Sequence, residues 1–195
     1  RQGEFVALLG GNGTGKSTTL RLLSEGLRPY RGTVRHTGRL GVLPQNPQAL
    51  FVKKTVREDL FEAFDGLHLP LAEQQRRGEQ MVTLCRLTEL LDHHPYDLSG
   101  GEQQRAALAK VMLLEPDILL MDEPTKGLDA EFKQSFAAMV RSLLSGGVTV
   151  LMVSSVGEKA VRAMRSQNRQ NTPPPRKQAG ITSSGFAVFK RLFAM

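Results

Sequence analysis

The chain has 195 residues, of which 40% are hydrophobic, so it is long enough for one domain with a substantial core. It has no apolar run near the ~20 residues that span a bilayer and no signal-peptide pattern, and its start at Arg1 instead of Met suggests an excised fragment. The formal net charge of +7 comes entirely from residues 156–195, because residues 1–155 hold 18 basic and 18 acidic residues, so the expected folded part is not a basic nucleic-acid-binding domain.

The first predicted element is a buried strand over residues 5–9, and a helix is predicted over residues 16–24. Between them, residues 10–17 match the phosphate-loop pattern G-x-x-x-x-G-K-[ST] in full. Glycines let the backbone amides surround a phosphate, Lys16 reaches the β- and γ-phosphates, and the Ser17 hydroxyl can bind Mg²⁺. The residues predicted to bind ATP are Gly10, Asn12, Gly13, Gly15, Lys16, Ser17 and Thr18.

A second strand is predicted over residues 39–43, followed by Gln45 in a loop with two prolines. Residues 54–98 are expected to be mostly helical and to form an insertion. The single cysteine, Cys85, lies in an apolar run and is expected in the core, without a disulfide.

The next motif is Leu98-Ser-Gly-Gly-Glu-Gln-Gln-Arg, at the start of an amphipathic helix predicted over residues 102–114 and ended by Pro116. Ser99 and Glu102 have the spacing of a capping box. Glycine amides at a helix N-terminus also form an anion site. The motif therefore predicts both a helix cap and a second phosphate-binding site.

Residues 118–123 form an apolar strand that ends in two acids, Asp122 and Glu123. The carboxyl ends of parallel strands are where open α/β folds bind ligands. Asp122 is predicted to hold Mg²⁺, and Glu123 is predicted to polarise the attacking water as general base.

The last clear strand is predicted over residues 148–153. Strands that alternate with helices predict an α/β fold with a mainly parallel sheet. Residues 165–184 are polar, basic and proline-containing, so disorder is expected there, and the apolar residues 186–189 are either a short strand or unstructured.

Taken in order, these motifs resemble the ATP-binding domain of ABC transporters over about residues 3–153. The resemblance implies a P-loop NTPase core with a helical subdomain over about residues 46–115, within a domain at 1–154 that is truncated at its N-terminus. Residues 155–195 do not match and are expected to be a disordered tail.

The resemblance also implies roles for particular residues. Gln45 is expected to contact Mg²⁺ and the attacking water, and Asp129 of Gly-Leu-Asp to contact a second ATPase protomer or domain, in a homo- or heterodimer. The expected Mg²⁺ ligands are Ser17, Gln45 and Asp122. The residues expected to face nucleotide held by the partner are Ser99, Gly100, Gly101, Glu102 and Gln103.

A finer resemblance is to ATPases of energy-coupling-factor transporters, which import vitamins, vitamin precursors, or cobalt and nickel ions. It rests on residues 45–47, Leu50-Phe51, residues 55–60 and residues 122–129. It implies a transmembrane partner that faces residues 46–60, with Leu50 and Phe51 either exposed to that partner or packed in the core. The expected location is cytoplasmic, on the inner face of the membrane, with no specific nucleic acid as partner.

Two family features are missing from the sequence. Only nine residues precede Gly10, so no upstream aromatic residue stacks on adenine, and weaker adenine binding is expected. Ser155 and Val156 stand where the family has a histidine and an aspartate. A serine carries no positive charge, so slow ATP hydrolysis is expected. A shifted reading frame or a fused foreign sequence after about residue 155 would explain the change, and a diverged natural tail is the alternative.

Two other functions remain open from the sequence. A soluble ABC ATPase of DNA repair or translation would share the motifs, but it calls for a long coiled coil, tandem domains or basic contact patches in the folded part. The balanced charge of residues 1–155 and the segment from Gln45 to Leu60 oppose it. The other is a degenerate fragment that binds nucleotide with little hydrolysis.

Overall fold

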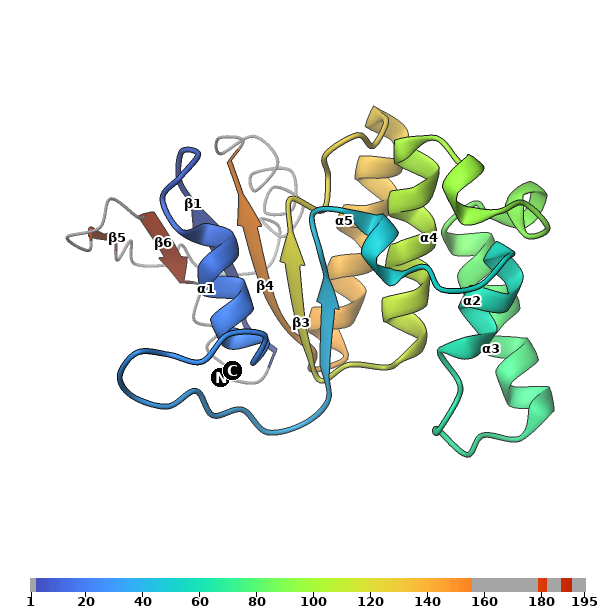
Figure 1. Cartoon of the computed structure of the whole chain (residues 1–195), viewed down its shortest axis with the longest axis horizontal. Coiled ribbons are helices and arrows are strands. Elements are labelled where there is room, and N and C mark those ends of the chain that lie inside the picture. The colour runs from blue at the N-terminus through green and yellow to red at the C-terminus, as the bar shows by residue number, and fades with distance from the viewer. Residues whose placement is uncertain (1–2, 156–178, 182–186, 191–195) are drawn as a thin grey trace.

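The computed structural model describes residues 3–155, 179–181 and 187–190, and its centre is one six-stranded sheet (Figure 1). Strand order is β2-β3-β4-β1-β6-β5, and the first four strands are parallel. Strand β6 pairs antiparallel with β1, and β5 pairs antiparallel with β6. The strands are β1 (Phe5–Leu9), β2 (Leu40–Leu43), β3 (Ile118–Asp122), β4 (Thr149–Ser154), β5 (Ala179–Ile181) and β6 (Ala187–Lys190). The predicted α/β class and mainly parallel sheet are confirmed.

Helices cover both faces of the sheet, and side-chain alternation along the strands decides which face each residue serves. On β3, Leu120 packs with Leu20 of helix α1 (Lys16–Leu23), whereas its neighbours Leu119 and Met121 belong to the larger core on the opposite face. Both faces of these parallel strands are buried, which explains their nearly continuous apolar sequences.

Helix α5 (Ala130–Ser145) lies on the larger-core face and was not predicted from the sequence. Its signals are present, however. Asp129 is an N-cap, and the apolar residues Phe132, Phe136 and Met139 recur at helical spacing and are buried.

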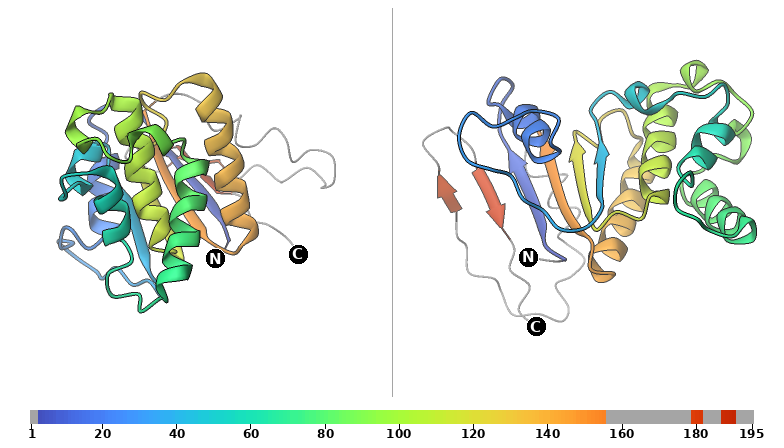
Figure 2. Two further views of the ribbon diagram at one scale, coloured as in Figure 1. Left: turned by 90° about the vertical axis from the view of Figure 1, so that its right-hand side faces the viewer. Right: turned by 60° about the horizontal axis from the view of Figure 1, so that its bottom comes forward.

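The helical subdomain contains α2 (Val56–Glu62) and α3 (Leu71–Leu84), which lie on the far side of α4 (Gly100–Leu113) from the sheet (Figure 2). Three short 3-10 turns complete it: η1 (Pro47–Leu50), η2 (Thr88–Leu90) and η3 (Pro95–Asp97). The expectation of a mostly helical insertion is met by α2 and α3.

Helix α4 differs from its prediction in two ways. It begins at Gly100 rather than at residue 102, because Ser99 caps it. It is also not amphipathic: nine of its fourteen residues are buried, because it packs against β2 on one side and against α2 and α3 on the other. A helix enclosed on several sides loses the polar stripe of a surface helix.

Phe51, which the sequence left as either exposed to a partner or packed in the core, is 6% exposed and belongs to the core. Leu50 is partly buried against the same core. Neither is an exposed contact for a partner, whereas the adjacent Val52 is 66% exposed.

The tail contains more structure than expected. Disorder was expected over residues 165–184, but residues 179–181 form β5. Strand β6, over residues 187–190, overlaps the apolar residues 186–189. The other residues from 156 onward lie outside the described part, so the domain boundary at residue 154 stays a prediction. In the part of the chain that the structure describes, no helix is long and apolar enough to cross a bilayer.

Candidate nucleotide-binding site

The phosphate loop connects β1 to α1 and closes on itself. Gly13 and Gly15 have φ values of 76° and 85°, which favour glycine. The Thr14 hydroxyl donates to the Gly11 carbonyl at 2.8 Å. A Cβ at Gly10 would lie 2.9 Å from Thr14 Oγ1, so a larger residue would disturb this closure.

Lys16 lies beneath this loop and is 7% exposed. Its Nζ donates to the Gly11 carbonyl at 2.7 Å. The ammonium is therefore held at the loop, while the predicted phosphate contacts Asn12, Gly13, Ser17 and Thr18 are exposed around it. An exposed loop with a retained cation at a helix N-terminus suits a phosphate group.

A cleft of about 640 Å³ brings together the three side chains predicted to bind Mg²⁺. Ser17 comes from the first turn of α1, Gln45 follows β2, and Asp122 ends β3. Residues that sequence reasoning did not single out also line the cleft: Arg21, Gln104 and Lys126. Arg21 and Gln104 are in helices, and a helical pattern does not reveal which face of a helix meets a cleft. Lys126 is in the turn after β3.

The donor set suits magnesium rather than a softer metal. A hydroxyl, an amide and a carboxylate all offer oxygen, and Mg²⁺ keeps further positions for water and phosphate. Within the described residues, no three His, Cys, Asp or Glu side chains are grouped to hold a metal by themselves. The cleft is thus the place where the residues fit Mg²⁺ together with a phosphate.

Glu123 is hydrogen-bonded to residues at the end of β4. Its backbone has a φ of 51° and its amide donates to the Val153 carbonyl at 2.9 Å. The carboxylate accepts hydrogen bonds from the Ser154 hydroxyl at 3.4 Å and from the Ser155 amide. Sequence reasoning treated Ser155 only as a missing histidine, whereas its backbone amide contacts the predicted general base.

The predicted capping box at the start of α4 is present. Glu102 Oε2 accepts from the Ser99 amide at 2.8 Å and from its hydroxyl at 2.7 Å, and the Glu102 amide donates to Ser99 Oγ at 3.4 Å. The Ser99 hydroxyl, and then its backbone amide, lower the pKa of Glu102. Gln103, expected to face a partner's nucleotide, is 6% exposed and donates from Nε2 to the Pro95 carbonyl at 3.1 Å.

Helix α4 and the Gly127-Leu128-Asp129 segment are in close contact within one chain. A Cβ at Gly101 would lie 2.9 Å from the Gly127 carbonyl oxygen, and Gly100 and Gly127 both line the cleft. Asp129 is the N-cap of α5, where its Oδ1 accepts from the Phe132 amide at 2.7 Å, and this hydrogen bond lowers the pKa of Asp129. Asp129 therefore has a structural role in its own chain.

Comparison with known proteins places these features in one family. Residues 1–126 match the family model described as ABC transporter. The chain is 35% identical over 178 residues to the energy-coupling factor transporter ATP-binding protein EcfA1 of Geobacillus kaustophilus, which covers 84% of this chain and 64% of that protein. It is 32% identical over 177 residues to the EcfA1 protein of Halalkalibacterium halodurans, again 64% of that protein. The chain thus spans slightly less than two thirds of these relatives.

Solved structures show the same fold. The cbiO1 protein of Clostridium perfringens, part of the ABC transporter complex cbiONQ, is 27% identical with a TM-score of 0.65, over 80% of this chain and 68% of that chain. A dimeric ATP-binding cassette bound to ADP and phosphate is 25% identical with a TM-score of 0.74, over 84% of this chain and 79% of that chain.

Proposed function

The chain belongs to the ABC transporter family of ATP-binding domains, and from that premise we propose that it binds and hydrolyses ATP to energise transport through a membrane partner. The observation that carries the proposal is the meeting of Ser17, Gln45 and Asp122 in one cleft beside Lys16. Three oxygen ligands from three segments, next to the cation of the phosphate loop, fit a nucleotide with its Mg²⁺.

In this proposal, different residues of the chain bind the phosphates and activate the water. Lys16 exchanges its contact with the Gly11 carbonyl for phosphate oxygens and supplies positive charge to them. Mg²⁺, when bound, neutralises charge on the phosphates. Glu123 polarises the attacking water, and Ser154 and the Ser155 amide orient its carboxylate.

Two protomers or domains complete the site, as a homodimer or a heterodimer. Ser99, Gly100 and Gly101 of one protomer present a helix N-terminus to nucleotide on the other, and Asp129 lies beside this surface as the cap of α5. A similar cassette was solved as a dimer with ADP and phosphate, which supports the proposal. Association should depend on ATP and be most visible when Glu123→Gln slows hydrolysis.

For the transported solute, the similarity to relatives named energy-coupling factor transporter ATP-binding proteins gives support to a proposal. We propose a vitamin, a vitamin precursor or a metal ion as substrate, and a transmembrane subunit that contacts residues 46–60. The exposed Val52 is available for that contact, whereas Phe51 is not. In this arrangement the chain lies at the cytoplasmic face of a membrane, and its partners include no specific nucleic acid.

The nucleotide site is tested by Lys16→Ala, with Lys133→Ala as the matched control because Lys133 is exposed on α5. Equilibrium binding of a fluorescent ATP analogue should be mostly lost in Lys16→Ala and unchanged in Lys133→Ala. Equal binding by both variants would refute the phosphate-loop assignment.

One observation favours a second candidate function, nucleotide binding without efficient turnover. Ser155 occupies the family's histidine position, and its serine hydroxyl cannot supply positive charge to the γ-phosphate. Steady-state phosphate release separates the two functions. A rate that Glu123→Gln abolishes supports the ATPase, and binding with no such rate supports the second candidate.

A further inference from the structure

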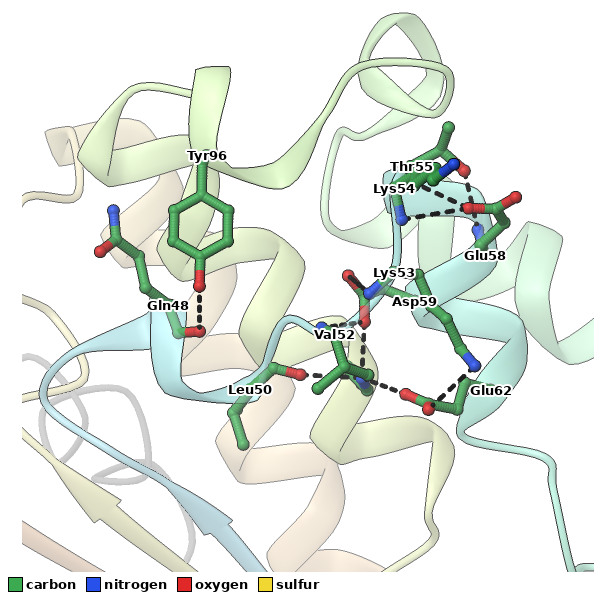
Figure 3. Close-up of polar contacts among 11 residues, drawn as sticks. Gln48, Leu50, Val52, Lys53, Lys54, Thr55, Glu58, Asp59, Glu62 and Tyr96 are labelled. Carbon is green, nitrogen blue, oxygen red and sulfur yellow. Dashed lines mark hydrogen bonds and ion pairs between the residues drawn. The ribbon is translucent and has the colours of Figure 1, made fainter.

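Lys110, in the last turn of α4, is the centre of a polar cluster that the nucleotide site does not use. Figure 3 labels three residues of this cluster, Leu50, Asp59 and Glu62. Its Nζ donates to the Leu50 carbonyl at 2.8 Å, to Asp59 Oδ1 at 2.7 Å and to Glu62 Oε2 at 2.7 Å. An ammonium has three hydrogens, so all of its donors are used. Its side chain is only 12% exposed.

Asp59 extends the cluster into the segment before α2. Its carboxylate accepts from the Val52 amide at 3.0 Å and from the Lys53 amide at 3.4 Å, and its side chain is 2% exposed. Lys53 also pairs with Glu62 at 3.3 Å. Figure 3 shows Asp59 and Glu62 reaching from α2 toward the 50–53 segment.

The cluster joins two parts of the candidate site. Leu50 ends η1, the turn that follows Gln45 of the cleft, and Ser99 caps the start of α4 at Gly100. A single ammonium therefore links the segment after Gln45 to the helix that begins with Gly100 and Gly101.

We propose that Lys110 is a positioning residue that couples Gln45 to the Ser99 end of α4. When segment 50–55 shifts, with bound nucleotide or with a membrane partner, Lys110 moves α4 with it. The proposal rests on the proposed function, since it assumes that Gln45 senses a bound nucleotide.

The test must remove the coupling without leaving a buried charge unpaired, because removing one partner of a buried pair is strongly destabilising by itself. The double variant Lys110→Met with Asp59→Asn replaces one positive and one negative side chain with uncharged ones, so the net charge is unchanged. The side-chain amide oxygen introduced at position 59 remains as an acceptor for the Val52 amide. The matched control is Arg76→Met with Glu73→Gln on α3 of the same subdomain, where an exposed arginine pairs with a half-buried glutamate. Glu73 also pairs with Arg77, which keeps Glu115 as a partner in this control.

The readout is hydrogen exchange of the full chain with and without the Mg²⁺ complex of a non-hydrolysable ATP analogue, alongside equilibrium binding of a fluorescent analogue. In the parent and the control, nucleotide should slow exchange at residues 99–105 by about tenfold, within the range typical for coupling between sites. In the neutral double variant the effect should fall below about twofold, at unchanged nucleotide affinity. Lys110→Arg keeps the charge but not the three-way geometry, and should retain only part of the effect.

The outcomes separate the two levels of inference. If nucleotide binds to the double variant and slows hydrogen exchange at residues 99–105 as much as it does in the parent, Lys110 has only a structural role and the proposal is overturned. A parent that binds nucleotide without any change at these residues overturns it as well. A parent that binds no nucleotide overturns the proposed function, and this inference with it.

Discussion

The contact between Gly101 and Gly127 allows a prediction with an internal control. A Cβ at Gly101 would lie 2.9 Å from the Gly127 carbonyl oxygen, whereas a Cβ at Gly100 would meet no heavy atom within 4 Å. Both glycines are in the first turn of α4, so alanine gives both a similar gain in helix propensity, at most about 1 kcal/mol. Their difference therefore isolates the clash.

Because the obstructing atom belongs to the backbone, it cannot move aside as a flexible side chain would. Overpacking of this kind costs about 1–3 kcal/mol. Gly101→Ala should thus be less stable than Gly100→Ala by about that amount, which corresponds to about 2–4 °C in Tm for each kcal/mol at this chain length.

Urea unfolding at fixed pH, followed by circular dichroism, measures the difference directly. Only the midpoint should move, since a change in slope would report a different denatured state. Equal midpoints for the two variants would show that α4 and the Gly127 segment do not pack as closely as the structure has them, and the reasoning would fail.

Three further predictions concern single side chains. Ser155→His should keep the backbone contact to Glu123, because that contact uses the amide of an exposed residue. The variant should recover part of the ~10²–10³-fold increase in the rate of phosphate release that one preorganised contact supplies. An unchanged rate would mean that the position is dispensable. Burial raises the pKa of the Cys85 thiol to about 12, so at pH 8 a thiol reagent should modify the chain only as it unfolds, and rapid labelling of the native chain would contradict the core assignment. Because the pKa of Glu102 is lowered in the folded chain, its charge stabilises the fold at pH values above its unfolded pKa of about 4.3, and this contribution is lost as the pH falls through the folded pKa. The urea midpoint of the parent should therefore exceed that of Glu102→Gln by less at pH 3 than at pH 6. A difference in midpoint that stays constant would argue against the hydrogen bonds from Ser99.

The features that local sequence encodes were predictable. The phosphate loop, the Ser99 cap and the strands predicted over residues 5–9 and 118–123 each depend on residues within a few positions of one another. Glycine spacing, apolar runs and capping pairs therefore carry the needed information. Helix α5 is also encoded locally, by its N-cap Asp129 and the spaced phenylalanines, so it was predictable from the sequence although it was not predicted.

Other features depended on residues that are distant in the sequence. Lys110 meets Leu50 across 60 positions, and Ser155 meets Glu123 across 32. Phe51 was undecided between core and surface until the packing of the subdomain buried it. The polar stripe expected on α4 was absent because neighbours enclose the helix on more than one side. Periodicity describes one element at a time, whereas burial and long-range hydrogen bonds arise only when elements pack together, and tertiary structure alone decides those contacts.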